Sequence, residues 1–259
     1  MDTRSSESQL ALFIDFDNVA LGKANRRQAK KFEIKPVMDR LLEKGKIIFK
    51  RAYADWSHYP KDKEELHSAG IELIEIPRPG ISGKNSADIR LVVDALELSY
   101  AKAHIDTFVV ISGDSDITPL VAKLRENRRF VIGMSLKESA SNLLVEACDE
   151  FIFIEDLEQK ETSPAPLDKL PKGKQKVFQL LLTTVGALLR EGRGALYGSL
   201  VKDTMKRKQP SFNELGYGYT TFGDLLEDAA ELGLIELTRD KNAGGTYVVT
   251  GLGPRARIG

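Results

Sequence analysis

The sequence predicts an α/β sandwich with a mostly parallel sheet, followed by a small helical domain. Three observations support this fold class. Strand-like and helix-like patterns alternate through residues 1–156, as in a parallel sheet covered by helices. The first strand-like run is apolar throughout, which is typical of a strand buried on both faces. After a proline-containing segment, the pattern changes to helices that precede two short strands.

The composition is that of a folded globular protein. The 259 residues are 42% hydrophobic and 29% charged, enough for one large domain or two smaller ones. No apolar run approaches the ~20 residues that span a bilayer, and the polar N-terminus lacks the apolar core of a signal peptide. One cysteine and three histidines argue against an internal disulfide and a structural zinc site. We therefore expect a cytoplasmic protein.

Short apolar runs predict six strands in this first part. Pro77 stops the third strand, because proline cannot donate to a sheet ladder. The runs are LALFID, KIIFKRAYAD, IELIEIP, TFVVIS, RFVIGM and EFIFIED. In an open α/β sheet, ligands bind beyond the carboxyl ends of the strands.

Five helices are expected between these strands. Glycine ends the first two, at Gly45 and Gly70, as it commonly does at a helix C-terminus. The helical segments are PVMDRLLEKG, KDKEELHSAG, SADIRLVVDALELSYAKA, DITPLVAKLREN and SASNLLVEAC. The third is the longest, and the loop RPGISGKN leads into it.

The rest of the chain follows a different pattern. Residues 157–172 contain three prolines and many charges, which predicts a linker. Residues 173–251 contain three helical stretches and then two short strands joined by DKNAGG, an order that predicts a winged helix-turn-helix domain. Residues 252–259 form a tail that we expect to fray.

Charge is unevenly distributed along the chain, although the net charge is zero. Residues 168–259 carry 14 Lys and Arg against 10 Asp and Glu, and residues 1–167 carry 24 against 28. An acidic first part and a basic second part fit a metal site beside a nucleic-acid-binding module.

The first strand ends in a group of polar residues, Asp15, Asp17 and Asn18. Side chains alternate along a strand, so we expect Asp15 and Asp17 on the same side. Two carboxylates at the end of a buried strand repel each other and stay ionised only beside a positive charge. The motif therefore indicates a metal site, covalent chemistry at Asp15, or the beginning of a turn.

Further carboxylates are expected at the same edge of the sheet. Asp114 and Asp116 follow the fourth strand and Ser112, and Asp88 begins the long helix. In a right-handed α/β fold these places can lie side by side. Clustered oxygen ligands suit Mg²⁺ or Mn²⁺, which bind carboxylates, water and substrate phosphate. The predicted cluster contains Asp15, Asp88, Asp114 and Asp116, with Asn18 nearby.

Structural roles remain open for several of these carboxylates. Asp88 would complement the dipole of its helix, Asp114 would belong to a turn, and Asp116 would cap the helix that follows it. Asp15 is the hardest to explain in this way, because it ends a buried strand.

Three other residues have ambiguous positions. Asp94 lies six residues after Asp88, on another face of the helix, and is expected to pair with Arg90. Trp56 follows the second strand, where it would stack on a base or pack in the core. Lys84 precedes the long helix, where it would meet a phosphate or remain solvated.

Four motifs together resemble a known family. FIDFDN, YADWS, KNSADIRLVVDAL and SGDSDITPLV, in this order, resemble the NYN domain, the LabA/DUF88 branch of the PIN-like nucleases, over residues 9–155. The resemblance implies a PIN-like fold and a ribonuclease that uses one or two Mg²⁺ or Mn²⁺ ions. It assigns metal binding to Asp15, Asp88, Asp114 and Asp116, with Asn18 in support. It leaves open the direct involvement of Asp17, Asp94 and Ser112.

The last part resembles an OST-HTH (LOTUS) domain over about residues 173–251. The likeness lies in GYGYTTFGDLLEDAAELGLIEL and the final GGTYVV. It implies RNA binding or docking of a partner protein, although charge runs of this kind are usually solvated helix ends. The candidate RNA contacts are Lys202, Lys206, Arg207, Lys208, Tyr217 and Tyr219.

The opening motif is also similar to the haloacid-dehalogenase phosphatases, in which Asp15 would form an aspartyl-phosphate and Asp17 would act as general acid. Asn18 departs from that family's pattern. Ser112 and Asp114 lie at the end of one strand, so two motifs that the family keeps apart would fall within five residues. A third possibility is a non-catalytic RNA-binding adaptor, but every acidic position is filled. The sequence thus favours a metal-dependent ribonuclease with a C-terminal domain that binds RNA or a protein.

Overall fold

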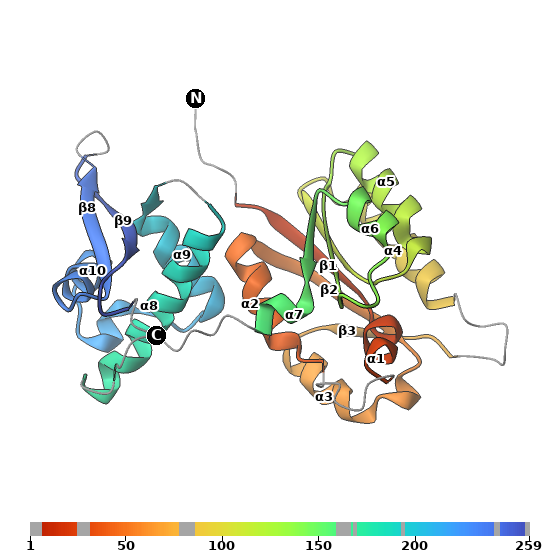
Figure 1. Ribbon diagram of the computed structural model, residues 1–259, viewed down its shortest axis with the longest axis horizontal. Coiled ribbons are helices and arrows are strands. Elements are labelled where there is room, and N and C mark those ends of the chain that lie inside the picture. Colours follow the sequence, from red (N-terminus) through yellow and green to blue (C-terminus); the bar gives the residue numbers. More distant parts are fainter. Residues whose placement is uncertain are drawn as a thin grey trace. The chain divides into compact units, whose positions relative to one another are not determined.

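The chain divides into two units, Met1–Gln159 and Lys160–Gly259. The structure is a computed structural model (Figure 1), and it describes residues 7–24, 32–77, 86–158, 167, 170–192, 195–240 and 244–256. Within these ranges, no helix has both the length and the apolar character needed to cross a membrane.

A six-stranded sheet forms the middle of the first unit. All neighbouring strands are parallel, in the order β3-β2-β1-β4-β5-β6. The strands are β1 (Gln9–Asp15), β2 (Lys46–Ala54), β3 (Glu72–Glu75), β4 (Thr107–Ile111), β5 (Phe130–Ser135) and β6 (Glu150–Phe153). The six predicted strands are thus present, and the strand order reverses between β1 and β4. Open α/β sheets bind their ligands beside such a reversal.

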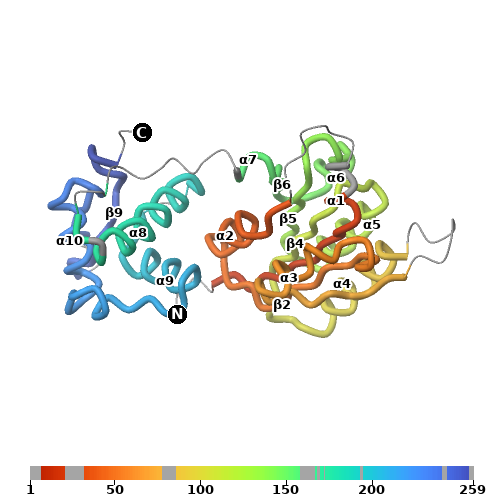
Figure 2. Tube along the Cα trace, turned by 90° about the horizontal axis from the view of Figure 1, so that it is seen from below, coloured from red at the N-terminus to blue at the C-terminus, as the bar shows by residue number. Residues whose placement is uncertain are grey.

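Helices cover both faces of this sheet, which gives the predicted α/β sandwich three layers (Figure 2). One face is covered by α1 (Phe16–Ala24), α2 (Ile34–Lys44), α3 (Pro60–Ser68) and α7 (Ile154–Glu158). The other face is covered by α4 (Ser86–Ala101), α5 (Thr118–Glu126) and α6 (Asn142–Ala147). Helices α1 and α7 were not expected, because each follows directly on a strand without a turn residue between them.

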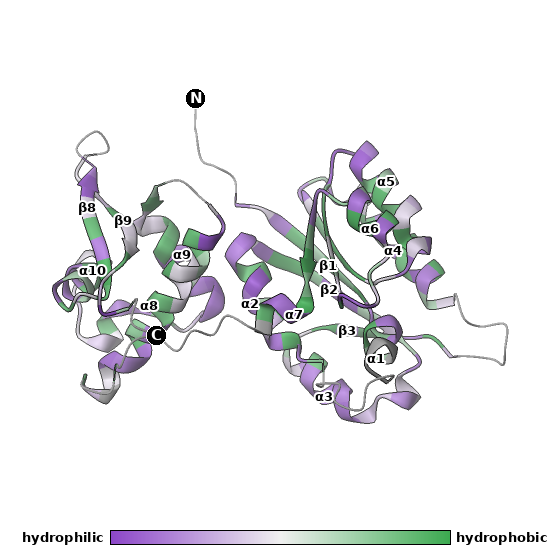
Figure 3. Cartoon of the chain, in the orientation of Figure 1, coloured by the Kyte–Doolittle hydropathy of each residue, from purple (hydrophilic) through white to green (hydrophobic). Residues whose placement is uncertain are grey.

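Strand β1 shows how the two faces are made. Leu12 and Ile14 belong to the core under α2, whereas Ala11 and Phe13 belong to the core under α4 and α5. All four are fully buried, and the inner strands are correspondingly hydrophobic in Figure 3. Because side chains alternate along a strand, the next residue in the second series, Asp15, ends β1 on the α4 side of the sheet.

The second unit combines three helices with a small antiparallel sheet. The helices are α8 (Lys172–Arg190), α9 (Gly198–Lys208) and α10 (Phe222–Glu231). The strands β7 (Leu196–Tyr197), β8 (Ile235–Asp240) and β9 (Thr246–Leu252) lie in the order β7-β9-β8. The three predicted helices and the predicted hairpin are present, whereas the two-residue β7 and the short 3-10 helix Glu214–Tyr217 were not predicted.

Candidate acidic site

Asp15 and Asp17 belong to different elements. Strand β1 ends at Asp15, and helix α1 begins at Phe16. The strand alternation expected to place both carboxylates on one side therefore does not reach Asp17, and that argument was wrong. Asp17 lies in the first turn of α1, where a negative charge complements the helix dipole. Both side chains are nevertheless buried, with 4% and 8% exposure.

The carboxylate of Asp15 is held between β1 and the end of β4. The hydroxyl of Ser112 donates to it at 2.9 Å, and the backbone N–H of Asn18 donates at 3.3 Å. Ser112 is fully buried, and its oxygen also accepts from the backbone N–H of Asp114 at 3.2 Å. Asp15 is therefore fixed at the point where the strand order of the sheet reverses.

Asn18 ties α1 to the loop after β4. Its side-chain oxygen accepts from the backbone N–H of Gly113 at 2.9 Å. Gly113 has no room for a side chain, because an added Cβ would lie 2.1 Å from the carbonyl oxygen of Ser139. The loop after β4 can therefore pass close to the backbone of Ser139. The hydrogen bond from Gly113 to Asn18 holds this loop against α1.

Asp15 and Asp88 form a close pair of carboxyl groups. The Asp88 carboxyl lies within hydrogen-bonding reach of that of Asp15. Burial, and then the charge of Asp88, raise the pKa of Asp15 to about 7, although hydrogen bonds from Ser112 and Asn18 act in the opposite direction. Burial, and then the charge of Asp114, raise the pKa of Asp88 as well. Two such groups need a shared proton or a cation between them.

Asp114 and Asp116 lie on the 3-10 turn that follows β4. The Asp114 side chain is half-buried and accepts from the backbone N–H of Asp116 at 3.0 Å. The capping role considered for Asp116 therefore belongs to Asp114, and Asp116 is exposed. Both negative charges raise the pKa of Asp88, so the two residues share the electrostatic environment of the Asp15–Asp88 pair.

The donor set fits a hydrated divalent ion better than an enclosed one. Among the described residues, no three His, Cys, Asp or Glu side chains form a group that could hold a metal ion. The four predicted ligands are thus not assembled into a closed cage. Mg²⁺, however, usually binds through one or two carboxylates and retains several waters. The contact between Asp15 and Asp88 supplies two carboxylates of this kind.

Asp94 is committed to a structural network. It is 6% exposed, and it forms the predicted ion pair with Arg90 at 2.8 Å. It also accepts from Arg51 at 3.0 Å and from the hydroxyl of Tyr53 at 2.9 Å. Two guanidinium groups and a phenol hydroxyl already occupy this carboxylate, so its contacts explain Asp94 as a structural residue.

Trp56 is a core residue. Its side chain is 1% exposed, and the indole N–H donates to the carbonyl of Ile74 at 2.9 Å. The ring packs beside Phe16 and Tyr59. The suggestion that it stacks on a base is therefore wrong, and the alternative of a core aromatic is correct. Lys84, the other candidate of this part, lies outside the described residues.

The two tyrosine candidates of the second unit are largely occupied by packing. Tyr219 is 7% exposed, and its hydroxyl donates to Asp228 at 2.5 Å, so its assignment as an RNA contact was wrong. Tyr217 is half-buried, and its ring stacks on Phe212 with centroids 6.1 Å apart. Only Tyr217 retains a partly exposed ring.

The basic candidates of the second unit belong to α9. Lys202 forms an ion pair with Glu214 at 2.5 Å, and Arg207 donates to Thr204 at 2.7 Å. Lys206 is exposed and Lys208 is half-buried. The three cations in the last turn of α9 are Lys206, Arg207 and Lys208. They complement the dipole at the C-terminus of this helix, so part of their role is structural.

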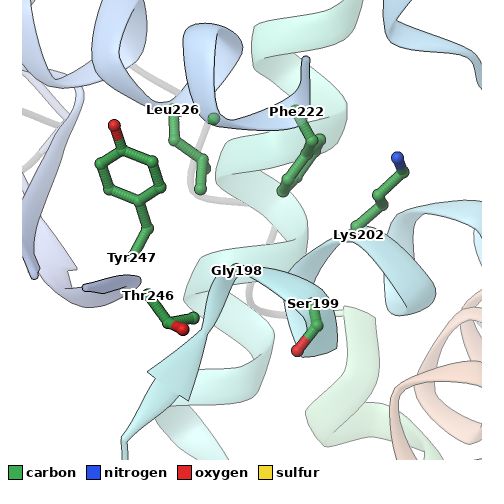
Figure 4. A pocket seen from close by; sticks show the side chains of 8 residues that line it. Gly198, Ser199, Lys202, Phe222, Leu226, Thr246 and Tyr247 are labelled. Atoms are coloured by element: carbon green, nitrogen blue, oxygen red, sulfur yellow. The ribbon is translucent and has the colours of Figure 1, made fainter. Parts of the chain in front are cut away.

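Sequence reasoning missed a pocket in the second unit. It has a volume of about 230 Å³ and is shown in Figure 4. Most of its lining is carbon, from an aliphatic side chain, two aromatic rings and two glycines. The lining residues are Gly198, Ser199, Lys202, Phe222, Gly223, Leu226, Thr246 and Tyr247. The signal in the sequence was weak, because it consists of two isolated glycines on different helices.

Comparison with known proteins identifies the family of the first unit. The NYN domain matches residues 9–155, more than half of the chain. The chain is 28% identical over 177 residues to an uncharacterized protein of Methanocaldococcus jannaschii. That alignment covers 68% of this chain and 65% of the relative, so the chain spans less than two thirds of the relative's length.

A solved structure has a similar fold. The crystal structure of a protein of unknown function from Vibrio parahaemolyticus matches with a TM-score of 0.53 and 23% identity. The match covers 61% of this chain and 98% of that protein, and at this identity it shows the fold alone. Together with the domain match, the parallel sheet and its acidic edge lead to one conclusion. The chain belongs to the NYN domain family, which is part of the PIN-like nuclease superfamily.

Proposed function

We propose that this protein is a metal-dependent ribonuclease that hydrolyses RNA phosphodiester bonds. The observation that carries the proposal is the contact between the buried carboxyl group of Asp15 and the half-buried carboxyl group of Asp88. Such a contact is unfavourable at neutral pH unless a cation joins it. Its position at the reversal of strand order, within a PIN-like nuclease fold, makes a phosphate-bearing substrate the best candidate ligand.

Each acidic residue has a role in this proposal. Asp15 and Asp88 would hold Mg²⁺ or Mn²⁺, with Asp114 beside them and Asp116 completing the site directly or through water. When bound, the ion would lower the pKa of a coordinated water and neutralise charge on the phosphate. Ser112 and Asn18 hold the Asp15 carboxylate and the β4 loop in place. In hydrolysis the water oxygen would form a bond to phosphorus while the bond to the leaving nucleoside oxygen breaks, and the proton lost by the water would pass through solvent to that oxygen.

The second unit would bring RNA to this site. Its three helices and β8–β9 hairpin support the assignment as a winged helix-turn-helix domain of OST-HTH (LOTUS) type. Lys206, Arg207 and Lys208 at the end of α9 are the proposed phosphate contacts, and a protein partner is the alternative occupant. In this proposal the protein acts in the cytoplasm.

The test is cleavage of labelled single-stranded RNA in the presence of Mg²⁺, Mn²⁺ or EDTA. The wild type should cleave only with a divalent ion, and Asp15→Asn should be inactive. Asp203→Asn, which changes an exposed aspartate of α9, is the matched control and should cleave normally. Cleavage that persists in EDTA or in Asp15→Asn would refute the proposed site. Hydrolysis of an aryl phosphate without RNA cleavage would favour the phosphatase alternative. RNA binding without either reaction would favour the non-catalytic adaptor.

The role of the second unit has a separate test. The substitutions Lys206→Gln and Lys208→Gln should each lower the slope of log affinity against log salt by about 1, if each lysine contacts a phosphate. Glu236→Gln, on the exposed side of β8, is the control and should leave the slope unchanged. An unchanged slope in all variants would point to docking of a protein at this surface.

A further inference from the structure

Helix α4 carries an apolar stripe on its outer face. Ile89, Val93 and Tyr100 are 62%, 52% and 64% exposed, and Leu96 between them is half-buried. The inner face of the same helix, including Leu91, is packed in the core. The four stripe residues follow one another at intervals of four, three and four residues, which is the spacing of a coiled-coil seam.

Opposite charges flank this stripe along one side. Arg90 directly follows Ile89, and Glu97 directly follows Leu96. Because Arg90 and Glu97 lie seven residues apart, both occupy the same side of the seam. Arg90 binds Asp94 through Nε, and half of its side chain is exposed. Glu97 is exposed, and it has no ion-pair partner in the part of the chain that the structure describes.

We propose that α4 pairs with α4 of a second copy of this chain, antiparallel across a two-fold axis. In the register that matches the stripe, Val93 of one copy faces Leu96 of the other, and Ile89 faces Tyr100. This register brings Arg90 of each copy beside Glu97 of the other, so symmetry gives two ion pairs.

The charges select this orientation over a parallel one. In a parallel pair, flanking positions contact each other with an offset of five residues, which would place Glu97 beside Val92 and form no ion pair. The seam covers only three helical turns, so we expect a small interface and a reversible, concentration-dependent dimer. Because Asp88 directly precedes Ile89, the acidic sites of the two copies would lie at opposite ends of the seam. The proposal does not depend on the nuclease reaction.

Sedimentation velocity of the full chain over a wide concentration range tests the pairing. The wild type should shift from monomer to dimer, and Val93→Glu should remain a monomer. Leu143→Glu, which changes a 65% exposed leucine of α6, is the matched control and should still dimerise. Glu97→Lys should weaken the dimer about tenfold at low salt, because it replaces two attractions by repulsions, and less at high salt.

Cysteine cross-linking tests the orientation. A mixture of Ile89→Cys and Tyr100→Cys chains should cross-link, whereas Ile89→Cys alone should not, because its counterpart lies at the other end of the seam. The wild type, which contains only Cys148, gives the background. A wild type that stays monomeric at all concentrations, or a dimer that Val93→Glu leaves intact, would overturn the pairing. Cross-linking of Ile89→Cys alone would overturn the antiparallel orientation.

Discussion

The hydroxyl of Ser112 donates a 2.9 Å hydrogen bond to the carboxylate of Asp15, which lies 97 positions earlier in the chain. Asp15 ends β1, and Ser112 directly follows the neighbouring strand β4, on the other side of the reversal in strand order. This hydrogen bond links the acidic site to the sheet. Substitution of either residue should therefore change the free energy of unfolding.

Replacing Ser112 by alanine should reduce the free energy of unfolding by about 1–3 kcal/mol, the usual cost of losing a buried hydrogen bond to a charged group. The loss should be larger at pH 8 than at pH 5, because only the ionised Asp15 needs the hydroxyl. Urea denaturation at the two pH values measures it. Ser99→Ala is the control, since this buried serine donates to the carbonyl of Leu96, and its loss should not depend on pH.

The apo protein should lose stability as pH rises from about 4 to about 7. The folded-state pKa of Asp15 is raised to about 7, mainly by burial, so the folded state retains a proton that the unfolded state has released. A single group of this kind contributes a slope of at most about 1.4 kcal/mol per pH unit, which vanishes above the folded pKa. Asp15→Asn should flatten this part of the profile in EDTA. An equally steep profile in Asp15→Asn would mean that other groups cause it.

Divalent ions should raise the melting temperature of the wild type. An ion that binds only the folded state stabilises it by mass action, and a hundredfold excess over the dissociation constant gives about 2.7 kcal/mol. The shift with Mn²⁺ should increase from pH 6 to pH 8 as the carboxyl pair ionises, and it should disappear in Asp15→Asn. In EDTA, Asp15→Asn should melt above the wild type at pH 8. Equal Mn²⁺ shifts in both proteins would exclude Asp15 as a ligand.

Trp56 should matter for stability and not for RNA binding. Trp56→Phe removes the hydrogen bond to Ile74 and part of a fully buried ring, which should cost on the order of 1–3 kcal/mol. Its affinity for RNA, measured by fluorescence anisotropy where the protein is folded, should equal that of the wild type. Phe130→Leu, at an exposed ring of β5, is the control for stability. A folded Trp56→Phe protein with reduced RNA affinity would contradict the burial of this ring.

Much of the first unit could be predicted from local pattern. Each strand of the sheet is an apolar run between polar segments, and the alternation of strands and helices determines the parallel topology. The opening motif placed Asp15 at the end of a buried strand, as the structure does, and a carboxylate in that position has few structural explanations. The pairing of Asp94 with Arg90 also followed from helical spacing alone.

What the sequence could not provide was long-range packing. The Ser112–Asp15 bond and the Asn18–Gly113 bond join segments about a hundred residues apart, and no local pattern encodes them. Trp56 was considered as a residue that stacks on a base, and Tyr219 was a candidate RNA contact, but tertiary packing buries both. Asp17 was misplaced because the strand ends at Asp15, two residues before Asp17, and helix α1 begins at Phe16.

The most direct test of the account is single-turnover cleavage of RNA by the wild type, Asp15→Asn, Asp88→Asn and the double variant, all with Mn²⁺. If the two carboxylates act as one site, each single substitution should remove most of the rate, and the double variant should be no slower than the single ones. Asp203→Asn should cleave as the wild type does. Cleavage by Asp15→Asn and Asp88→Asn at the wild-type rate would contradict the assignment of this carboxyl pair as the catalytic site.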